Sequence, residues 1–180
     1  MHVSVRRMRP DEWPAARAAC SDAFDDPGIP LLLDTLHSSW GWSDDLAFVA
    51  VRADQVVALV VFTPCFVDAL DRVVPVLVLS PLGVRSDLQG QGIGDALVRH
   101  ALGELERTRP EPAVFLEGIP SYYPRFGFRR GADLGFTAAS ARVPEAAFMV
   151  YPLPSYDPSI RGALVYADAF WRADAVGLRE

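Results

Sequence analysis

The sequence predicts an α/β protein in which a hairpin comes early and a strand–helix–strand unit follows. Two apolar runs within residues 46–63 are separated by residues 52–55, a spacing typical of a β-hairpin. Farther along, the apolar run 76–84 leads through a glycine-rich loop into a helical pattern over residues 95–106. The apolar run 113–116 then predicts the strand that follows this helix.

The composition predicts one domain that spans residues 1–180. A chain of 180 residues with 51% hydrophobic content can bury one core and is somewhat short for two. Residues 153–180, rich in proline and aromatic residues, are expected to fold back on the body as a C-terminal tail. The formal net charge of −6 argues against a nucleic-acid partner, which would require a basic surface.

The sequence also predicts a cytoplasmic protein without a membrane partner. It contains no run of about 18 apolar residues, and no apolar segment follows the arginines near the N-terminus. Cys20 and Cys65 are far apart and lack the spacing of metal ligands, so neither a metal site nor a disulfide framework is expected.

The first elements follow from local patterns. Residues 3–6 alternate apolar and polar side chains and suit a short strand. Pro10 and the acidic residues after it mark a helix start, and this helix should run to about Phe24. Residues 25–30 contain two prolines and a glycine that break it, and a second helix is predicted over residues 31–39.

Two prolines shape the expected strands. Pro64 should end the second strand of the hairpin, with residues 65–74 crossing polar ground before the next strand. Ser80-Pro81 interrupts that next strand, and a proline has no N–H to donate to a ladder. We therefore expect a bulge there, which frees backbone groups from pairing.

The most informative stretch is residues 89–94, with the sequence Gln-Gly-Gln-Gly-Ile-Gly. Between a strand and a helix, such a loop aims backbone N–H groups at one point near the positive end of a helix dipole, where phosphates bind. A tight turn without a ligand gives the same pattern. A P-loop would require lysine and a hydroxyl residue where Asp95 and Ala96 stand, and a dinucleotide fingerprint would require its third glycine at Asp95.

A third interpretation, an acyl-CoA pyrophosphate loop, comes from a family resemblance. Gln89, Gly92 and Gly94 match the Arg/Gln-x-x-Gly-x-Gly/Ala motif of the GCN5-related N-acetyltransferase (GNAT) superfamily. Tyr123 to Phe128 resembles the Tyr-x-x-x-Gly-Phe block that follows the next strand in that family, in the form typical of the YhbS-like branch. The two motifs occur in the expected order, and the resemblance is strong from about residue 77 to residue 151.

The resemblance implies a fold and a co-substrate. The fold would be a mixed, mostly antiparallel central sheet flanked by helices, whose middle strands splay around acetyl-CoA (coenzyme A). The bulged strand would hold the acyl arm, and the early helices would line the acceptor pocket. Asp22, Asp25 and Asp26 could attract a cationic acceptor there, although acidic loops are more often simply solvated. The residues implied in CoA binding are Leu82, Gly83, Val84, Gln89, Gly90, Gln91, Gly92, Ile93, Gly94, Asp95, Tyr123 and Arg125.

Two catalytic residues are expected. Tyr123 occupies the position of the family's motif tyrosine, whose phenol would protonate the departing thiolate. The alternative is a packed aromatic ring, with Tyr122 the more exposed of the pair. Glu117 ends a strand beside the cleft and is the candidate base, with Asp87 a weaker choice; a carboxylate at a strand end can instead be a capping group. Arg125 could meet a CoA phosphate or a surface carboxylate.

The predicted function is transfer of an acetyl group from acetyl-CoA to a primary amine of a small molecule or protein, by direct attack on the thioester. The alternative is a non-catalytic module that binds acyl-CoA as a sensor. A toxin that acetylates charged tRNA is disfavoured because its substrate requires a basic approach surface, whereas the net charge is −6. The acceptor and acyl chain stay open, and a homodimer is possible.

Overall fold

A computed structural model describes residues 3–178; residues 1, 2, 179 and 180 of the predicted domain lie outside this range. The helices are α1 (Trp13–Ser21), α2 (Gly28–His37), α3 (Ile93–Thr108) and α4 (Asp168–Arg172). The strands are β1 (Val3–Arg7), β2 (Ala47–Arg52), β3 (Gln55–Ala69), β4 (Val73–Val84), β5 (Ala113–Glu117), β6 (Arg129–Arg130), β7 (Phe136–Thr137), β8 (Phe148–Pro152) and β9 (Gly162–Val165). No helix within residues 3–178 is both long and apolar enough to cross a bilayer.

The strands form one mixed sheet in the order β1-β2-β3-β4-β5-β8-β6, with β9 also paired to β3 and to β7. All pairings are antiparallel except β4 with β5 and β7 with β9. The parallel ladder of β4 and β5 is limited to Leu77–Val114 and Val78–Phe115, so the two strands diverge beyond it. The predicted fold, a mostly antiparallel sheet with helices and splayed middle strands, is confirmed.

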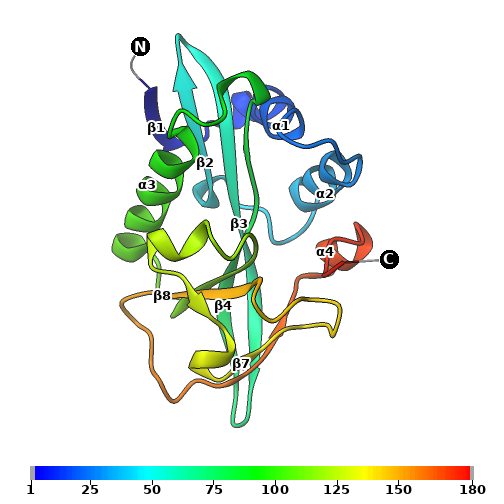
Figure 1. The fold of residues 1–180 in the computed structure, drawn as a ribbon, viewed down its shortest axis with the longest axis vertical. Helices are drawn as coiled ribbons and strands as arrows, with labels where there is room; N and C mark the ends of the chain where they lie inside the picture. Colours follow the sequence, from blue (N-terminus) through cyan, green and yellow to red (C-terminus); the bar gives the residue numbers. More distant parts are fainter. Residues whose placement is uncertain (1–2, 179–180) are drawn as a thin grey trace.

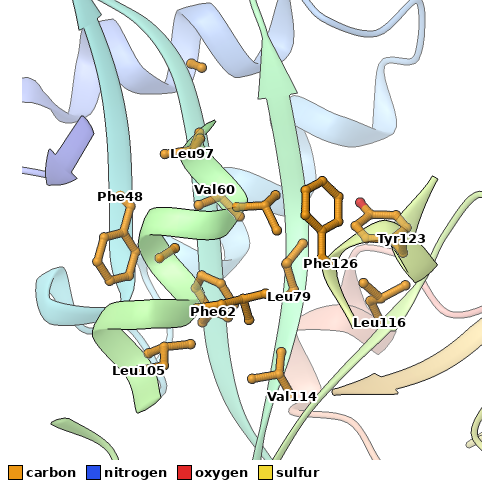
Figure 2. Close-up of a cluster of buried hydrophobic side chains, with 14 of the residues drawn as sticks. Phe48, Val60, Phe62, Leu79, Leu97, Leu105, Val114, Leu116, Tyr123 and Phe126 are labelled. Carbon is orange, nitrogen blue, oxygen red and sulfur yellow. The ribbon is translucent and has the colours of Figure 1, made fainter. Parts of the chain in front are cut away.

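Successive side chains of β2 and β3 point to opposite faces of the sheet, so the two strands contribute to two separate core clusters. Phe48 and Phe62 lie on the face of the sheet that α3 covers, and they belong to one cluster with Leu97 and Leu105 of that helix (Figure 2). Their neighbours in sequence, such as Val49, belong to the opposite face, where α1 and α2 pack. Figure 1 accordingly shows α3 on one side of β2 and β3 and the two early helices on the other.

The bulge predicted at Ser80-Pro81 is present in β4. Val60 of β3 pairs with Leu82, whereas Phe62 pairs with Leu79, so two residues of β4 lie opposite one residue of β3 and β4 carries one extra residue. The peptide bond between Ser80 and Pro81 is cis. The bulge lies just beyond the residues of β4 that pair with β5, at the point where the splayed region begins.

The prediction that β3 ends at Pro64 is wrong. The strand continues to Ala69, and residues 65–69 and 73–74 are ladder residues rather than a polar crossing. Pro64 pairs with β4 on one edge, while on the other edge β2 stops opposite Val61 and β9 starts opposite Phe66. The proline therefore stands in a gap between two partner strands, where a missing N–H breaks no ladder hydrogen bond.

The C-terminal tail packs on the body. It contributes β9 to the sheet and then α4, which contacts α2 (Figure 1). Tyr166 and Phe170 are buried in a second core cluster with Phe115 of β5 and Val150 of β8. This cluster lies on the face of β5 opposite Val114 and Leu116, which belong to the core beneath α3.

Candidate active site

A cavity of about 720 Å³ opens where β4 and β5 diverge. Its walls come from the bulged end of β4, the loop before α3, the chain after β5 and the connection between α1 and α2. The predicted site residues that line it are Leu82, Gly83, Val84, Gln89, Gly90, Gly92, Ile93, Gly94, Asp95, Glu117, Tyr123 and Arg125. The lining residues not predicted from the sequence are Ala23, Phe24, Ile29, Leu79, Ser80, Pro81, Leu88, Gly118, Ile119 and Tyr122.

Residues 89–94, called here the phosphate loop, run directly into α3. Gly90 and Gly92 have φ angles of 73° and 79°, a left-handed conformation that favours glycine. Gly92 is the N-cap of α3, and the N–H of Ala96 bonds back to its carbonyl at 3.0 Å. The N–H groups before Ala96 have no partner inside the helix, so they and the helix dipole are available to an anion. A Cβ at Gly90 or Gly92 would meet no heavy atom within 4 Å, so the loop borders open space.

Side chains fix this loop to its surroundings. The amide nitrogen of Gln89 donates to the carbonyls of Val84, at 3.0 Å, and Ala23, at 3.3 Å. The sequence predicted contact with CoA for Gln89, and the structure adds this bracing of the loop. Gln91 differs from the other predicted residues, because it does not line the cavity and its side-chain oxygen accepts a hydrogen bond from Arg52.

Two of the three acidic residues before α2 have partners outside the cavity. The Asp22 carboxylate accepts hydrogen bonds from the backbone N–H and the hydroxyl of Ser86, at 2.8 and 2.7 Å, which lower the pKa of Asp22. An oxygen of Asp26 accepts from the N–H of Gly28 at 2.7 Å. Among the described residues that line the cavity, Asp22, Asp25 and Asp26 are absent. The structure therefore gives no support to their attracting an acceptor into it.

Three side chains form a polar cluster at the start of α3. The Tyr122 hydroxyl donates to Asp95 at 3.0 Å, and the Arg125 guanidinium lies 3.7 Å from the other Asp95 oxygen. The guanidinium carbon of Arg125 also lies 4.7 Å from the centre of the Tyr122 ring. Burial, together with the Asp95 carboxylate, raises the pKa of Tyr122. Arg125 is half exposed and places a positive charge at the edge of the cavity beside the phosphate loop.

Tyr123 is 9% exposed and begins the short 3-10 helix Tyr123–Phe126. Its ring lies beside Phe126 and near Leu116 (Figure 2), and a Cβ on Gly118 would come within 2.3 Å of it. Burial raises the pKa of Tyr123 to about 12, so the phenol stays protonated at neutral pH. Tyr122 is the more exposed of the two tyrosines, and no residue between 3 and 178 forms a hydrogen bond with the Tyr123 hydroxyl.

Glu117 ends β5 and lines the cavity, and its carboxylate accepts hydrogen bonds from two residues of the C-terminal tail that do not line the cavity. Oε1 accepts a hydrogen bond from the Tyr166 hydroxyl at 2.6 Å, and Oε2 accepts one from the N–H of Gly177 at 3.0 Å. Burial raises the pKa of Glu117, and these two hydrogen bonds oppose that rise. Asp87, the weaker candidate, is ion-paired with Arg85 at 2.6 Å and does not line the cavity.

Within residues 3–178, no group of three or more His, Cys, Asp or Glu side chains could hold a metal ion. Cys20 and Cys65 are buried free thiols, and burial raises the pKa of both to about 12. The polar groups that reach the cavity are therefore backbone N–H groups, two carboxylates, two tyrosines, one arginine, Gln89 and Ser80.

These features define a class of protein. A strand with a bulge, a neighbouring strand that diverges from it, and a glycine loop at a helix start form one cavity. Comparison with known families matches residues 4–131 to the acetyltransferase (GNAT) domain. The chain belongs to this family, and the resemblance stated from its motifs is confirmed.

Particular relatives refine this assignment. The solved structure of the GNAT family N-acetyltransferase YhbS from Escherichia coli, in complex with CoA, covers 99% of this chain and 97% of its own. It has a TM-score of 0.85 and 26% sequence identity. A GNAT family acetyltransferase from Brucella melitensis, in complex with acetyl-CoA, shares the fold with a TM-score of 0.72 and 24% identity, over 94% of this chain and 98% of its own.

A curated relative is also similar in sequence. The uncharacterized N-acetyltransferase YjhQ of Escherichia coli strain K12 is 35% identical over 95 residues. The match spans 51% of this chain and 51% of YjhQ, so the two align over about half of their lengths.

Proposed function

We propose that the protein transfers an acetyl group from acetyl-CoA to a primary amine of a small molecule or a protein, by direct attack of the amine on the thioester. The observation that carries this proposal is the convergence of the phosphate loop, the bulge of β4, Tyr123 and Glu117 on one cavity. Two structural neighbours, which are described as complexes with CoA and with acetyl-CoA, support it.

The cavity suits the co-substrate. The phosphate loop presents unpaired N–H groups to open space, which is what a pyrophosphate requires. Arg125 adds a positive charge there, and the diverging ends of β4 and β5 leave room for an extended arm. The residues proposed to hold acetyl-CoA are Leu82, Gly83, Val84, Gln89, Gly90, Gly92, Ile93, Gly94, Asp95, Tyr123 and Arg125, which all line the cavity. Acetyl-CoA supplies the activated acyl group.

Two side chains are assigned to proton transfer. Glu117, with its pKa raised by burial, takes the proton from the ammonium group of the acceptor, directly or through a water molecule. Tyr123, protonated at neutral pH, donates a proton to the thiolate that leaves, and the proton that the attacking nitrogen loses on forming the amide restores the phenol. Transfer by direct attack requires no covalent bond to the enzyme, so the protein's main contribution is to position the two reactants.

One observation favours a second candidate, a non-catalytic acyl-CoA sensor. Both carboxylate oxygens of Glu117 already accept hydrogen bonds from the C-terminal tail, as a purely structural carboxylate would. Each oxygen nevertheless keeps a second lone pair, and Glu117 lines the cavity. Turnover decides between the two candidates, because both of them bind acetyl-CoA.

Binding is tested first by thermal shift with acetyl-CoA, CoA and NAD, because a ligand that binds the folded state raises the melting midpoint. We expect a shift with both CoA species and none with NAD. Gly92→Asp, which puts a carboxylate beside the loop N–H groups, should abolish the shift. Gly103→Asp is the matched control, because it adds the same charge to α3 at a position where a Cβ has open space and which does not line the cavity. Equal shifts in both variants would refute the loop assignment.

Catalysis is tested by release of free CoA thiol in the presence of a panel of amines. We expect turnover with at least one primary amine, and a loss of roughly ten- to a hundredfold in Tyr123→Phe at nearly constant acetyl-CoA affinity. Binding without turnover across small amines, peptides and proteins with free N-termini would favour the sensor. An unchanged pH–rate profile in Glu117→Gln would remove Glu117 as the base.

A further inference from the structure

The Glu117 carboxylate, at the end of β5, is hydrogen-bonded to the C-terminal tail. Its two donors, the Tyr166 hydroxyl and the Gly177 N–H, lie 49 and 60 residues farther along the chain, at 2.6 and 3.0 Å. Neither donor lines the cavity, so both approach Glu117 from the side away from it. Both also lie beyond residue 131, where the match to the acetyltransferase domain ends. The two donors therefore lie outside the segment matched to the acetyltransferase domain, whereas Glu117 lies inside it.

The donors are themselves held in place. Tyr166 is 6% exposed, and its ring lies 5.0 Å from that of Phe170. The segment around Gly177 is tied to Arg142, whose guanidinium donates to the Val176 carbonyl at 2.8 Å. The carbonyl of Arg142 in turn accepts from the next N–H after Gly177 at 3.2 Å. These bonds fix the direction from which Glu117 receives its hydrogen bonds.

We propose that the C-terminal tail completes the active site, with Tyr166 as a positioning residue that orients the Glu117 carboxylate toward the cavity. This inference rests on the proposed function, in which Glu117 is the base. A hydrogen bond to each oxygen limits rotation of the carboxylate and leaves the remaining lone pairs for the acceptor. Bonds from two donors also favour the charged form of the carboxylate, whereas burial favours its neutral form.

The groups around Glu117 give the sign of the effect. Burial raises the pKa of Glu117, and the hydrogen bonds from Tyr166 and Gly177 and the charge of Arg142 each lower it. Removing the Tyr166 hydroxyl removes one of the lowering effects, so the pKa should rise further. The titratable groups that face this region are Tyr166 after β9, Arg142 before β8, Cys65 of β3, which accepts from the Ala167 N–H, and Tyr123 across the cavity.

The test is Tyr166→Phe, which deletes the hydroxyl and keeps the packed ring. Titration of the Glu117 side-chain carboxyl carbon by NMR gives the pKa directly and requires no acceptor. We expect the Glu117 midpoint to rise by about one pH unit, as follows from loss of one hydrogen bond to a charged group. The matched control is Tyr151→Phe. Its hydroxyl also donates to a glutamate, Glu106, at 2.5 Å, but neither residue lines the cavity. An unmoved Glu117 midpoint in Tyr166→Phe would overturn the inference.

Turnover separates this inference from the proposed function. With an amine acceptor, the acid limb of kcat/KM should move to higher pH in Tyr166→Phe by the same amount as the NMR midpoint, while Tyr151→Phe should follow the unaltered protein. If Glu117→Gln changes the pH profile and Tyr166→Phe does not, the positioning role fails and Glu117 stays the base. If Glu117→Gln leaves the profile unchanged, the assigned base fails, whatever Tyr166 does. Acetyl-CoA affinity and the melting midpoint show that each variant is folded.

Discussion

Gly118→Ala should disturb catalysis through the position of one ring. A Cβ at Gly118 would come within 2.3 Å of one carbon of Tyr123 and 2.8 Å of the next, and within 3.1 Å of Leu116. Carbon atoms pack at about 3.5–4.0 Å, so the Tyr123 ring must move by more than about 1 Å. The φ angle of Gly118 is not in the left-handed region, so the substitution acts by volume rather than by backbone strain. A displacement of about 1 Å at a reacting group can reduce the rate by roughly a hundredfold.

The assay combines turnover with acetyl-CoA affinity in a double-mutant cycle. Gly118→Ala should lower kcat by roughly ten- to a hundredfold and change acetyl-CoA affinity by less than about threefold. In a Tyr123→Phe background the same change should cost little more, because the two substitutions act on one group. Gly103→Ala is the control, since a Cβ there meets no atom within 4 Å. Additive losses in the double variant would refute the assignment of the effect to Tyr123.

Three further outcomes are expected. The Arg6 hydrogen bonds lower the pKa of Glu12 to about 2. The stability that they contribute is therefore present above the usual glutamate pKa and is lost as the pH falls from about 4.5 toward 2. Denaturant titration should show a loss of about 2 kcal/mol over this range, and Glu12→Gln should lack this loss. Phe170→Ala should lower the free energy of unfolding by about 3–5 kcal/mol in one cooperative transition, and a separate early transition would argue against a single domain. Arg125→Gln should weaken acetyl-CoA binding by roughly three- to tenfold by calorimetry, with a smaller effect at high salt; equal affinities would remove its phosphate role.

The strands were predictable where local pattern and pairing agree. The bulge at Ser80-Pro81 followed from the chemistry of proline and is present. The same chemistry gave a wrong strand end at Pro64, because a missing N–H is costly only where a neighbouring strand would accept a hydrogen bond from it. At Pro64 the neighbours on one edge are two strands, β2 and β9, that leave a gap between them. β9 is a short strand that comes about 100 residues after Pro64, so no local pattern could reveal that gap.

The candidate site divides in the same way. The phosphate loop, Tyr123 and Arg125 lie in two short motifs, and the structure brings both motifs to one cavity. Glu117 was identifiable as a carboxylate at a strand end. Its partners Tyr166 and Gly177 were not, because they reach it through tertiary packing of the tail. Tyr122 could have been found as the neighbour of the motif tyrosine, whereas Ala23, Phe24 and Ile29 enter through the placement of the early helices.

The bonds that brace the phosphate loop have a thermodynamic consequence. Gln89 reaches the carbonyl of Ala23, and Ser86 reaches the carboxylate of Asp22, so the segment before α2 is joined to the chain around the loop. Phe24, next in that segment, lines the cavity. In the proposed function the loop contacts acetyl-CoA and this wall contacts the amine, so acetyl-CoA that orders the loop would also order the wall. Binding of acetyl-CoA would then change the affinity for the amine, and binding of the amine would change the affinity for acetyl-CoA by the same factor.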